Sequence, residues 1–432
     1  MNANSIGWCM FFLGLFFKTQ VHLIGYIGVS ELFVIVSAPF IFVREYAAMK
    51  RDGVKPIMNL AFMAIVGCVL SSLINGSSFA QFARGFAQVY TTWASLVVGY
   101  YLLRRNIMSY RWYVLGYFLS GILSIYFLQG AAATVGAGGQ VSSKYATDMI
   151  VNSAMFWQGR ILPGINLPIQ MFYLQCPHIY SVIAPIICGV FSLYLSEGSG
   201  RAAFAVLGLS SMLIALGGKT GRSMYRARKW FWITIVLCVI LASGLKSAYS
   251  WAASSGRLGD KAEVKYRDQT QRGTDMLSIL ISGRTDFFIG LYACLQKPIV
   301  GHGPWPLDTE GYRAYFYTKY GTVEDFKNVQ EYSERYAMKS IPAHSHLVGY
   351  WLEYGILALP FWLYVIWLMF RYFREDLDVS PAMFGWFVFA IPSTLMGILF
   401  APYANRVGIP ILIIALMLIH ERKRQSMRFG WR

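Results

Sequence analysis

The chain has 432 residues, of which 56% are hydrophobic and only 14% are charged, and its mean hydropathy is +0.46. Soluble globular domains carry about 25% charged residues, so this composition excludes that class and indicates a membrane protein. The net charge of +17 does not indicate a nucleic-acid partner, because Lys and Arg gather in short clusters between apolar runs, the positive-inside pattern of membrane proteins.

The apolar runs predict membrane-crossing helices, because about 18 to 24 apolar residues in a helix cross a ~30 Å hydrocarbon core. In the first half of the chain we expect them at residues 6–17, 23–43, 57–74, 85–103 and 112–129. Residues 130–158 are too polar to cross and predict an outer loop. After a weaker, proline-interrupted candidate at 161–175, clear runs follow at residues 179–196, 202–218, 231–245, 347–370, 381–400 and 407–419.

Basic clusters set the expected orientation, because Lys and Arg mark cytoplasmic loops. They lie at residues 44–55, 104–111 and 219–229 and in the tail from Glu421. An even number of crossings must separate the second cluster from the third. Residues 161–175 therefore either cross the membrane, which places Arg201 on the outer face, or are re-entrant, which places Arg201 inside.

The sequence thus predicts an all-α fold, a polytopic helical membrane protein of about 11–12 transmembrane helices with a large outer loop. The loop is expected outside the cytoplasm because its acidic residues nearly match its basic ones in number. We expect N-terminal transmembrane helices in residues 1–245, the large loop in 246–345, C-terminal transmembrane helices in 346–420 and a basic cytoplasmic tail in 421–432.

Two residues of the large loop are candidates for chemistry. Arg284 follows a glycine, and a guanidinium offers a planar fork of donors that matches phosphate oxygens. The alternative for Arg284 is a surface charge or a snorkelling anchor. His344 directly precedes an expected helix, and histidine suits a general base because it titrates near neutral pH. The alternative for His344 is a structural role, which is the commoner one for an isolated histidine.

Arg160, Arg201 and Arg222 are further cationic candidates for binding the substrate, although Arg222 lies within a basic cluster expected in the cytoplasm. We expect no metal, because His344 and His346 stand two residues apart without a carboxylate neighbour. The chain also has no Walker loop and no dinucleotide-binding glycine fingerprint, so no cofactor is expected.

The order of these features resembles the O-antigen ligase and Wzy-type polymerase superfamily. Ser-Gly-Arg at 282–284 opens the large loop, and Lys-Pro-x-x-Gly-x-Gly follows at 297–303. The closest match is His344-Ser345, nine residues, Gly355, two residues and Ala358, where ligases commonly end the motif with Gly or a similar residue. The resemblance covers the second half of the chain, and it covers the first half by topology alone.

The resemblance implies a metal-independent glycosyltransferase of the bacterial inner membrane, multi-pass, with a cytoplasmic C-terminus and a periplasmic large loop. Its donor would be a polyprenyl-diphosphate-linked glycan, and it would need no cofactor. Membrane lipid, a chain-length regulator and a flippase are the further partners implied.

The resemblance also implies roles for single residues. His344 corresponds to the motif histidine, which would take the proton of the acceptor hydroxyl, and Arg284 to the arginine inside the loop. Arg201 corresponds to the arginine that precedes a helix before the loop, with Arg222 as a competing alignment. Arg160 fits the paired-arginine loops of polymerases. Arg284 and Arg201 would hold the diphosphate.

Three functions remain open from the sequence. We favour a Wzy-type polymerase of a surface polysaccharide or exopolysaccharide, because of Arg160 and because the tight turn at Arg201 and Ala358 do not match the ligase pattern well. The alternative is an O-antigen ligase that passes the glycan to lipid A-core. A more distant alternative is a lipid-linked glycan transporter, which would require ionisable residues or broken helices near the middle of the membrane.

Overall fold

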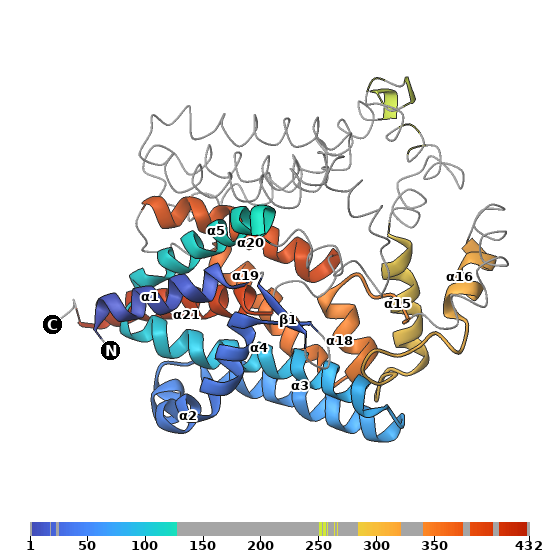
Figure 1. The fold of residues 1–432 in the computed structure, drawn as a ribbon, viewed down its shortest axis with the longest axis horizontal. Coiled ribbons are helices and arrows are strands. Elements are labelled where there is room, and N and C mark those ends of the chain that lie inside the picture. The colour runs from blue at the N-terminus through green and yellow to red at the C-terminus, as the bar shows by residue number, and fades with distance from the viewer. Residues whose placement is uncertain are drawn as a thin grey trace.

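A computed structural model describes most of the N-terminal and C-terminal thirds of the chain (Figure 1). The described residues are 2–17, 19–22, 26–127, 284–320, 340–374, 381–400 and 406–429, with a few isolated positions between 250 and 266. Helices make up most of them. The described strands are β1 (Gln20–His22) and β2 (Tyr26–Gly28), which pair antiparallel. The predicted all-α class is therefore confirmed for the described part of the chain.

The N-terminal helices surround one long helix, α4 (Phe79–Arg105). Helices α2 (Val29–Arg51), α3 (Lys55–Ile74) and the C-terminal α21 (Gly408–Phe429) all pack against it. Helix α1 (Ala3–Leu15) pairs with α5 (Tyr110–Phe127), and a 3-10 turn, η1 (Ile107–Ser109), links α4 to α5. The main apolar core lies between these helices and the helices of residues 346–400, and α4 is the helix against which α2, α3 and α21 all pack.

Two helix starts differ from the predicted ones because of local capping. The apolar run from residue 23 becomes helical only at Val29, since β1 and β2 precede it and Glu31 accepts a hydrogen bond from the Gly28 N–H at 2.9 Å. Helix α4 instead begins six residues before the predicted residue 85. There, Gln81 N–H donates to Ser78 Oγ at 3.3 Å and the Gln81 side chain accepts from Ser78 N–H at 3.0 Å, a capping box.

The C-terminal elements are α15 (Thr285–Gln296), α16 (Tyr312–Tyr320), α18 (His346–Tyr354), α19 (Leu359–Arg374), α20 (Pro381–Phe400) and α21. Residues 347–370 were expected to form one continuous crossing helix, and the structure instead has a break at Gly355 between α18 and α19. Helix α21 also continues through the expected tail as far as Phe429.

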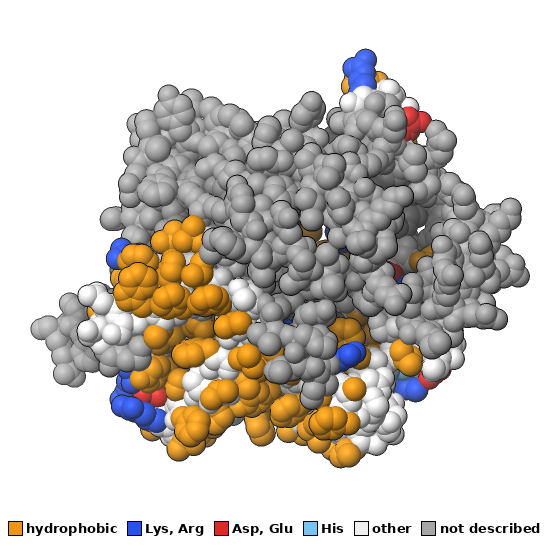
Figure 2. All heavy atoms as spheres, in the orientation of Figure 1, with side chains coloured by type: hydrophobic (Ala, Val, Ile, Leu, Met, Phe, Trp, Pro, Cys, Tyr) orange, Lys and Arg blue, Asp and Glu red, His pale blue; other side chains and the backbone are white. Residues whose placement is uncertain are grey.

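Among the described helices, α2 and α3 are long and apolar enough to cross a membrane, by length and composition alone. Many of their apolar side chains are exposed, including Phe40 and Val43 on α2 and Leu73 and Ile74 on α3. Figure 2 shows hydrophobic side chains covering the lower left of one face, in the region of α1 to α3. The predicted crossings between residues 161 and 245 lie outside the described residues.

The glycines of the 297–303 motif and Gly355 allow two backbone segments to pack directly against each other. Gly301, Gly303 and Gly355 all have positive φ, at 76°, 86° and 71°. His302 N–H donates to the Leu352 carbonyl at 2.7 Å, and Gly303 N–H donates to the Glu353 carbonyl at 3.1 Å. These hydrogen bonds hold the 297–303 segment of the large loop against the C-terminal end of α18. Glycine adopts such positive φ values without strain.

Replacing Gly355 with alanine is expected to destabilise the fold by about 3 kcal/mol. A Cβ there would lie 2.1 Å from the Ile299 carbonyl oxygen, and the backbone conformation, with φ 71° and ψ −164°, adds ~1–3 kcal/mol for a residue other than glycine. Gly311→Ala is the matched control, because Gly311 has φ +73° with nothing within 4 Å of an added Cβ. Denaturant unfolding of the detergent-solubilised protein measures both, and equal losses would contradict the close-packing explanation.

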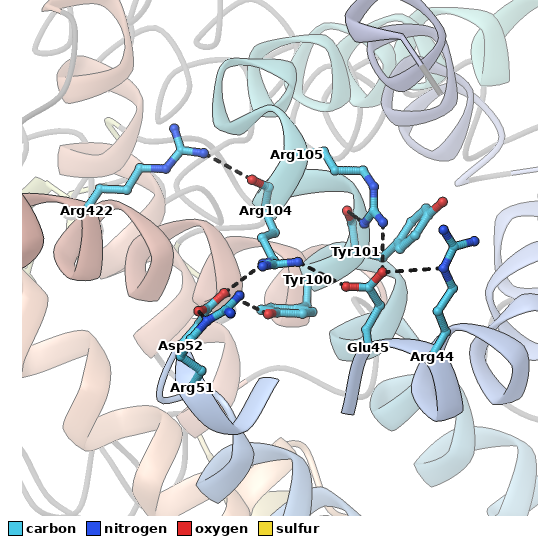
Figure 3. Close-up of polar contacts among 9 residues, drawn as sticks. All are labelled: Arg44, Glu45, Arg51, Asp52, Tyr100, Tyr101, Arg104, Arg105 and Arg422. Carbon is cyan, nitrogen blue, oxygen red and sulfur yellow. Dashed lines mark hydrogen bonds and ion pairs between the residues drawn. The ribbon is translucent and has the colours of Figure 1, made fainter. Parts of the chain in front are cut away.

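A network of ion pairs and hydrogen bonds joins α2, α4 and α21 at the C-terminal end of α4 (Figure 3). Arg104 contacts Asp52 at 2.9 Å and Glu45 at 3.2 Å, and Arg105 contacts the other Glu45 oxygen at 2.7 Å. Arg422 donates to the Arg104 carbonyl at 3.2 Å. Residues from three of the predicted cytoplasmic clusters therefore lie together.

Glu45→Ala is expected to cost about 2–3 kcal/mol of stability. Its side chain is 7% exposed, and its removal leaves two partly buried arginines without that carboxylate. Arg44→Ala should cost less than ~0.5 kcal/mol, because Arg44 is 73% exposed and lies 3.9 Å from Glu45. The same unfolding measurement compares the two variants, and a larger loss for Arg44→Ala would refute this explanation.

Candidate functional site

The candidate site forms where the N-terminal ends of α15 and α18 meet. The two helices pack together over a small apolar core that includes Ile289, Ala293 and Val348. Gly290 allows the close approach, because a Cβ there would lie 2.6 Å from the Pro342 carbonyl oxygen. Ser345 caps α18 by accepting a hydrogen bond from Val348 N–H at 3.2 Å. The packing brings residues 284–286 beside His344.

His344 contacts a carboxylate on the first turn of α15. Its Nδ1 lies 3.3 Å from Oδ2 of Asp286, and its side chain is 52% exposed. The other oxygen of Asp286 lies 3.7 Å from Nη1 of Arg313, which comes from α16. One carboxylate therefore lies between an accessible histidine and an arginine.

Arg284 occupies the N-cap position of α15 and reaches the C-terminal end of α20. Its Nη1 donates to the Phe400 carbonyl at 3.3 Å, and its guanidinium carbon lies 5.1 Å from the centre of the Phe400 ring. Ser345, next to His344, donates its hydroxyl to the Ile398 carbonyl at 3.0 Å. The C-terminal end of α20 therefore contacts Arg284 and also Ser345, the residue next to His344.

The other histidine of the motif is buried. His346 is 3% exposed and packs against Trp362, with 4.9 Å between ring centres. Glu353 is also buried, at 4% exposure, and its backbone carbonyl accepts from the Ser71 hydroxyl at 2.7 Å. Both residues sit within the packed structure, whereas His344 is accessible to a substrate.

A third histidine, His302, lies in the glycine motif at 297–303 and has a structural role. Its Nε2 lies 2.9 Å from the Ala293 carbonyl, so the ring must carry a proton on that nitrogen. Burial lowers the pKa of His302 below its usual value, and the charge of Lys297 acts in the same direction. Lys297 itself pairs with Glu310 at 2.6 Å.

Arg160, Arg201 and Arg222 lie outside the described residues, so their proposed roles stay predictions. Within the described ranges, no three side chains of His, Cys, Asp or Glu come together in a group able to hold a metal ion. The sequence also contains one Asp-x-Asp pair, Asp376 and Asp378, whose carboxylates are of the kind that bind metal ions, and this pair lies outside those ranges. The expectation of a metal-independent site remains a prediction.

Sequence reasoning missed Asp286 and Arg313. Asp286 follows Arg284 by two residues in the first turn of a helix, where a carboxylate is favoured by the helix dipole, and this position was the available signal. Arg313 lies in a run of aromatic residues and offered no signal, because its place depends on how α16 packs against α15.

The described site combines an accessible histidine, its carboxylate partner, two arginines and the N-terminal ends of two helices. Helix N-termini and guanidinium groups both favour anions, while the histidine can accept a proton. This combination suits proton transfer beside a bound phosphate-bearing group. Scans against protein-family models and against curated proteins find no match to this chain.

Proposed function

We propose that the chain is a polytopic membrane glycosyltransferase, a Wzy-type polymerase of a surface polysaccharide or exopolysaccharide. It would transfer glycan from a polyprenyl-diphosphate donor to a lipid-linked acceptor at the periplasmic face of the bacterial inner membrane. The observation that carries the proposal is the convergence of His344 and Arg284, residues distant in sequence, on the shared N-terminal ends of α15 and α18. It is supported by the motif resemblance described above.

The distribution of groups along α3 and α4 supports a membrane setting. At one end of α3, Ser71 and Asn75 contact the loop segment that carries Gly301 and Gly303. At the other end lie Asp52 and its basic neighbours. The 20 residues of α3 span ~30 Å, the thickness of a bilayer core, so the glycine segment of the large loop and the basic cluster fit opposite membrane surfaces.

The diphosphate would bind where positive charge gathers. Arg284 contributes a guanidinium, and α15 and α18 each contribute the positive end of a helix dipole, which favours an anion by ~0.3–1 kcal/mol. As the glycosyl bond breaks, negative charge builds on the diphosphate, and these groups stabilise it more strongly than they stabilise the ground state.

His344 would act as the general base. The acceptor hydroxyl oxygen forms a bond to the anomeric carbon of the donor while its proton passes to Nε2 of His344. The bond from that carbon to the phosphate oxygen breaks, and its electron pair leaves with the polyprenyl diphosphate. The diphosphate is already a good leaving group, so the scheme includes neither a nucleotide nor a metal ion.

Complementation tests the proposal in a bacterial strain that lacks this chain. We expect His344→Ala and Arg284→Ala to abolish glycan assembly at equal expression. Arg257→Ala is the matched arginine control, because Arg257 is an exposed loop residue whose guanidinium stacks on Trp251 at 4.2 Å, and it should behave as wild type.

Glycans from the variant strains are separated on gels, and the species that accumulates shows whether the acceptor is a lipid-linked glycan or lipid A-core. Single lipid-linked repeat units indicate a polymerase. Full-length polymer that is not joined to lipid A-core would instead indicate the ligase. Normal product from both His344→Ala and Arg284→Ala would refute the proposed roles of these two residues and favour the transporter.

A further inference from the structure

Asp286 links two side chains that come from different parts of the chain. Its Oδ2 lies 3.3 Å from Nδ1 of His344, and its Oδ1 lies 3.7 Å from Nη1 of Arg313. The three residues belong to α15, to the segment before α18 and to α16. A change in any one of these elements would therefore alter the surroundings of His344.

Arg313 is held firmly enough to fix the position of Asp286. Its side chain is only 17% exposed, its backbone N–H donates to Asp308 at 3.0 Å, and its Nη2 donates to the Ser340 carbonyl at 3.3 Å. Asp308 is itself buried at 4% exposure and accepts a second bond from Tyr312 N–H at 2.8 Å, at the start of α16. Arg313 is thus anchored to both the loop and the segment that leads to His344.

The contact has a chemical consequence for His344. A neutral imidazole carries its proton on one nitrogen, and a carboxylate beside Nδ1 favours the tautomer with the proton there. The lone pair is then on Nε2, in a side chain that is half exposed.

We propose that Asp286 is the positioning residue of His344, and that Arg313 holds Asp286 in place for that task. This inference rests on the proposed function, since it assigns Asp286 a part in the same proton transfer. Asp286 itself would touch neither donor nor acceptor. It would fix the tautomer and the orientation of the base.

The tautomer can be measured without any activity assay. The chain has 6 histidines, so the 15N spectrum of histidine-labelled protein in lipid bilayers is simple enough to isolate His344 by subtracting the His344→Asn spectrum. We expect wild-type His344 to carry its neutral-state proton on Nδ1. In Asp286→Ala, we expect the population with the proton on Nε2 to become the larger one.

Turnover provides the second measurement. Asp286→Ala should lower kcat by at least ~10-fold and by no more than ~10⁴-fold, the loss seen when the carboxylate that orients a general-base histidine is replaced, with KM changed less than about twofold. Asp286→Asn keeps the side-chain volume, so it controls for a loss of rate caused by misfolding. It should also lower kcat. Asp286→Glu should restore part of the rate. Glu310→Ala is the acidic control, because Glu310 pairs with Lys297 in the same loop, and it should leave both kcat and the His344 spectrum unchanged.

The two measurements separate this inference from the proposed function. If His344 has the same tautomer in wild type, Asp286→Ala and Asp286→Asn, the positioning role is overturned. If Asp286→Ala changes the tautomer but wild-type protein transfers no glycan, the Asp286–His344 interaction stands and the glycosyltransferase proposal fails.

Discussion

Replacing His344 with alanine is expected to lower the rate of glycan transfer by ~10²–10⁴-fold, the usual contribution of a general base. The alanine cannot accept the proton of the acceptor hydroxyl, so the hydroxyl must attack with its proton still attached. Because the ring is half exposed and lies outside the apolar cores, its removal should cost little stability. Donor binding should be nearly unchanged, so the loss should appear in kcat.

The pattern of the loss distinguishes a base from a structural residue. His344→Ala should melt within a few degrees of wild type, whereas a variant at the buried His346 should lose stability as well as rate. A His344→Ala protein with a full transfer rate would exclude the proposed base. A loss of rate that follows unfolding would assign His344 to the fold.

Arg284→Ala is expected to lower kcat/KM by ~10²–10³-fold, as for removal of a preorganised group that stabilises developing negative charge. The reason is that the positive charge beside the leaving diphosphate is lost. Arg284→Lys should recover only part of the rate, because an ammonium keeps the charge but lacks the planar fork that matches phosphate oxygens.

The contact with Phe400 offers a competing explanation that can be tested. The Arg284 guanidinium donates to the Phe400 carbonyl at the end of α20, so the alanine variant loses a hydrogen bond worth ~0.5–1.5 kcal/mol as well as a charge. If the rate falls only in proportion to the loss of folded protein, Arg284 holds α20 and does not bind the donor. Arg257→Ala again serves as the control.

Hydropathy alone predicted several helices closely, because their ends coincide with changes in composition. Helix α3 (Lys55–Ile74) matches the predicted run at 57–74, and α20 matches the run at 381–400. The break at Gly355 was not predictable in this way, since a single glycine in a long apolar run is usually tolerated. The break depends on Ile356 N–H bonding to the Ile299 carbonyl, a contact that only the packed loop supplies.

The candidate site was predictable in part for a similar reason. His344 and Arg284 stand out because their chemistry is unusual at the edges of apolar runs, and the motif resemblance singles out the same pair. Asp286 offered only its place in the first turn of a helix, a common position for a carboxylate, and Arg313 offered no signal. Their importance comes from the packing of α15 against α16 and α18, which places Asp286 beside His344 and Arg313 beside Asp286.

The most direct test of the central claim is a transfer assay with purified protein in liposomes, supplied with a polyprenyl-diphosphate-linked repeat unit and neither nucleotide nor metal ion. Products are resolved by mass spectrometry. We predict that wild-type protein joins repeat units and releases polyprenyl diphosphate, while His344→Ala, equally folded, forms no product above background. Joining of repeat units by His344→Ala at the wild-type rate, or no transfer by wild type when the same donor is used by a known polymerase, would contradict the proposal.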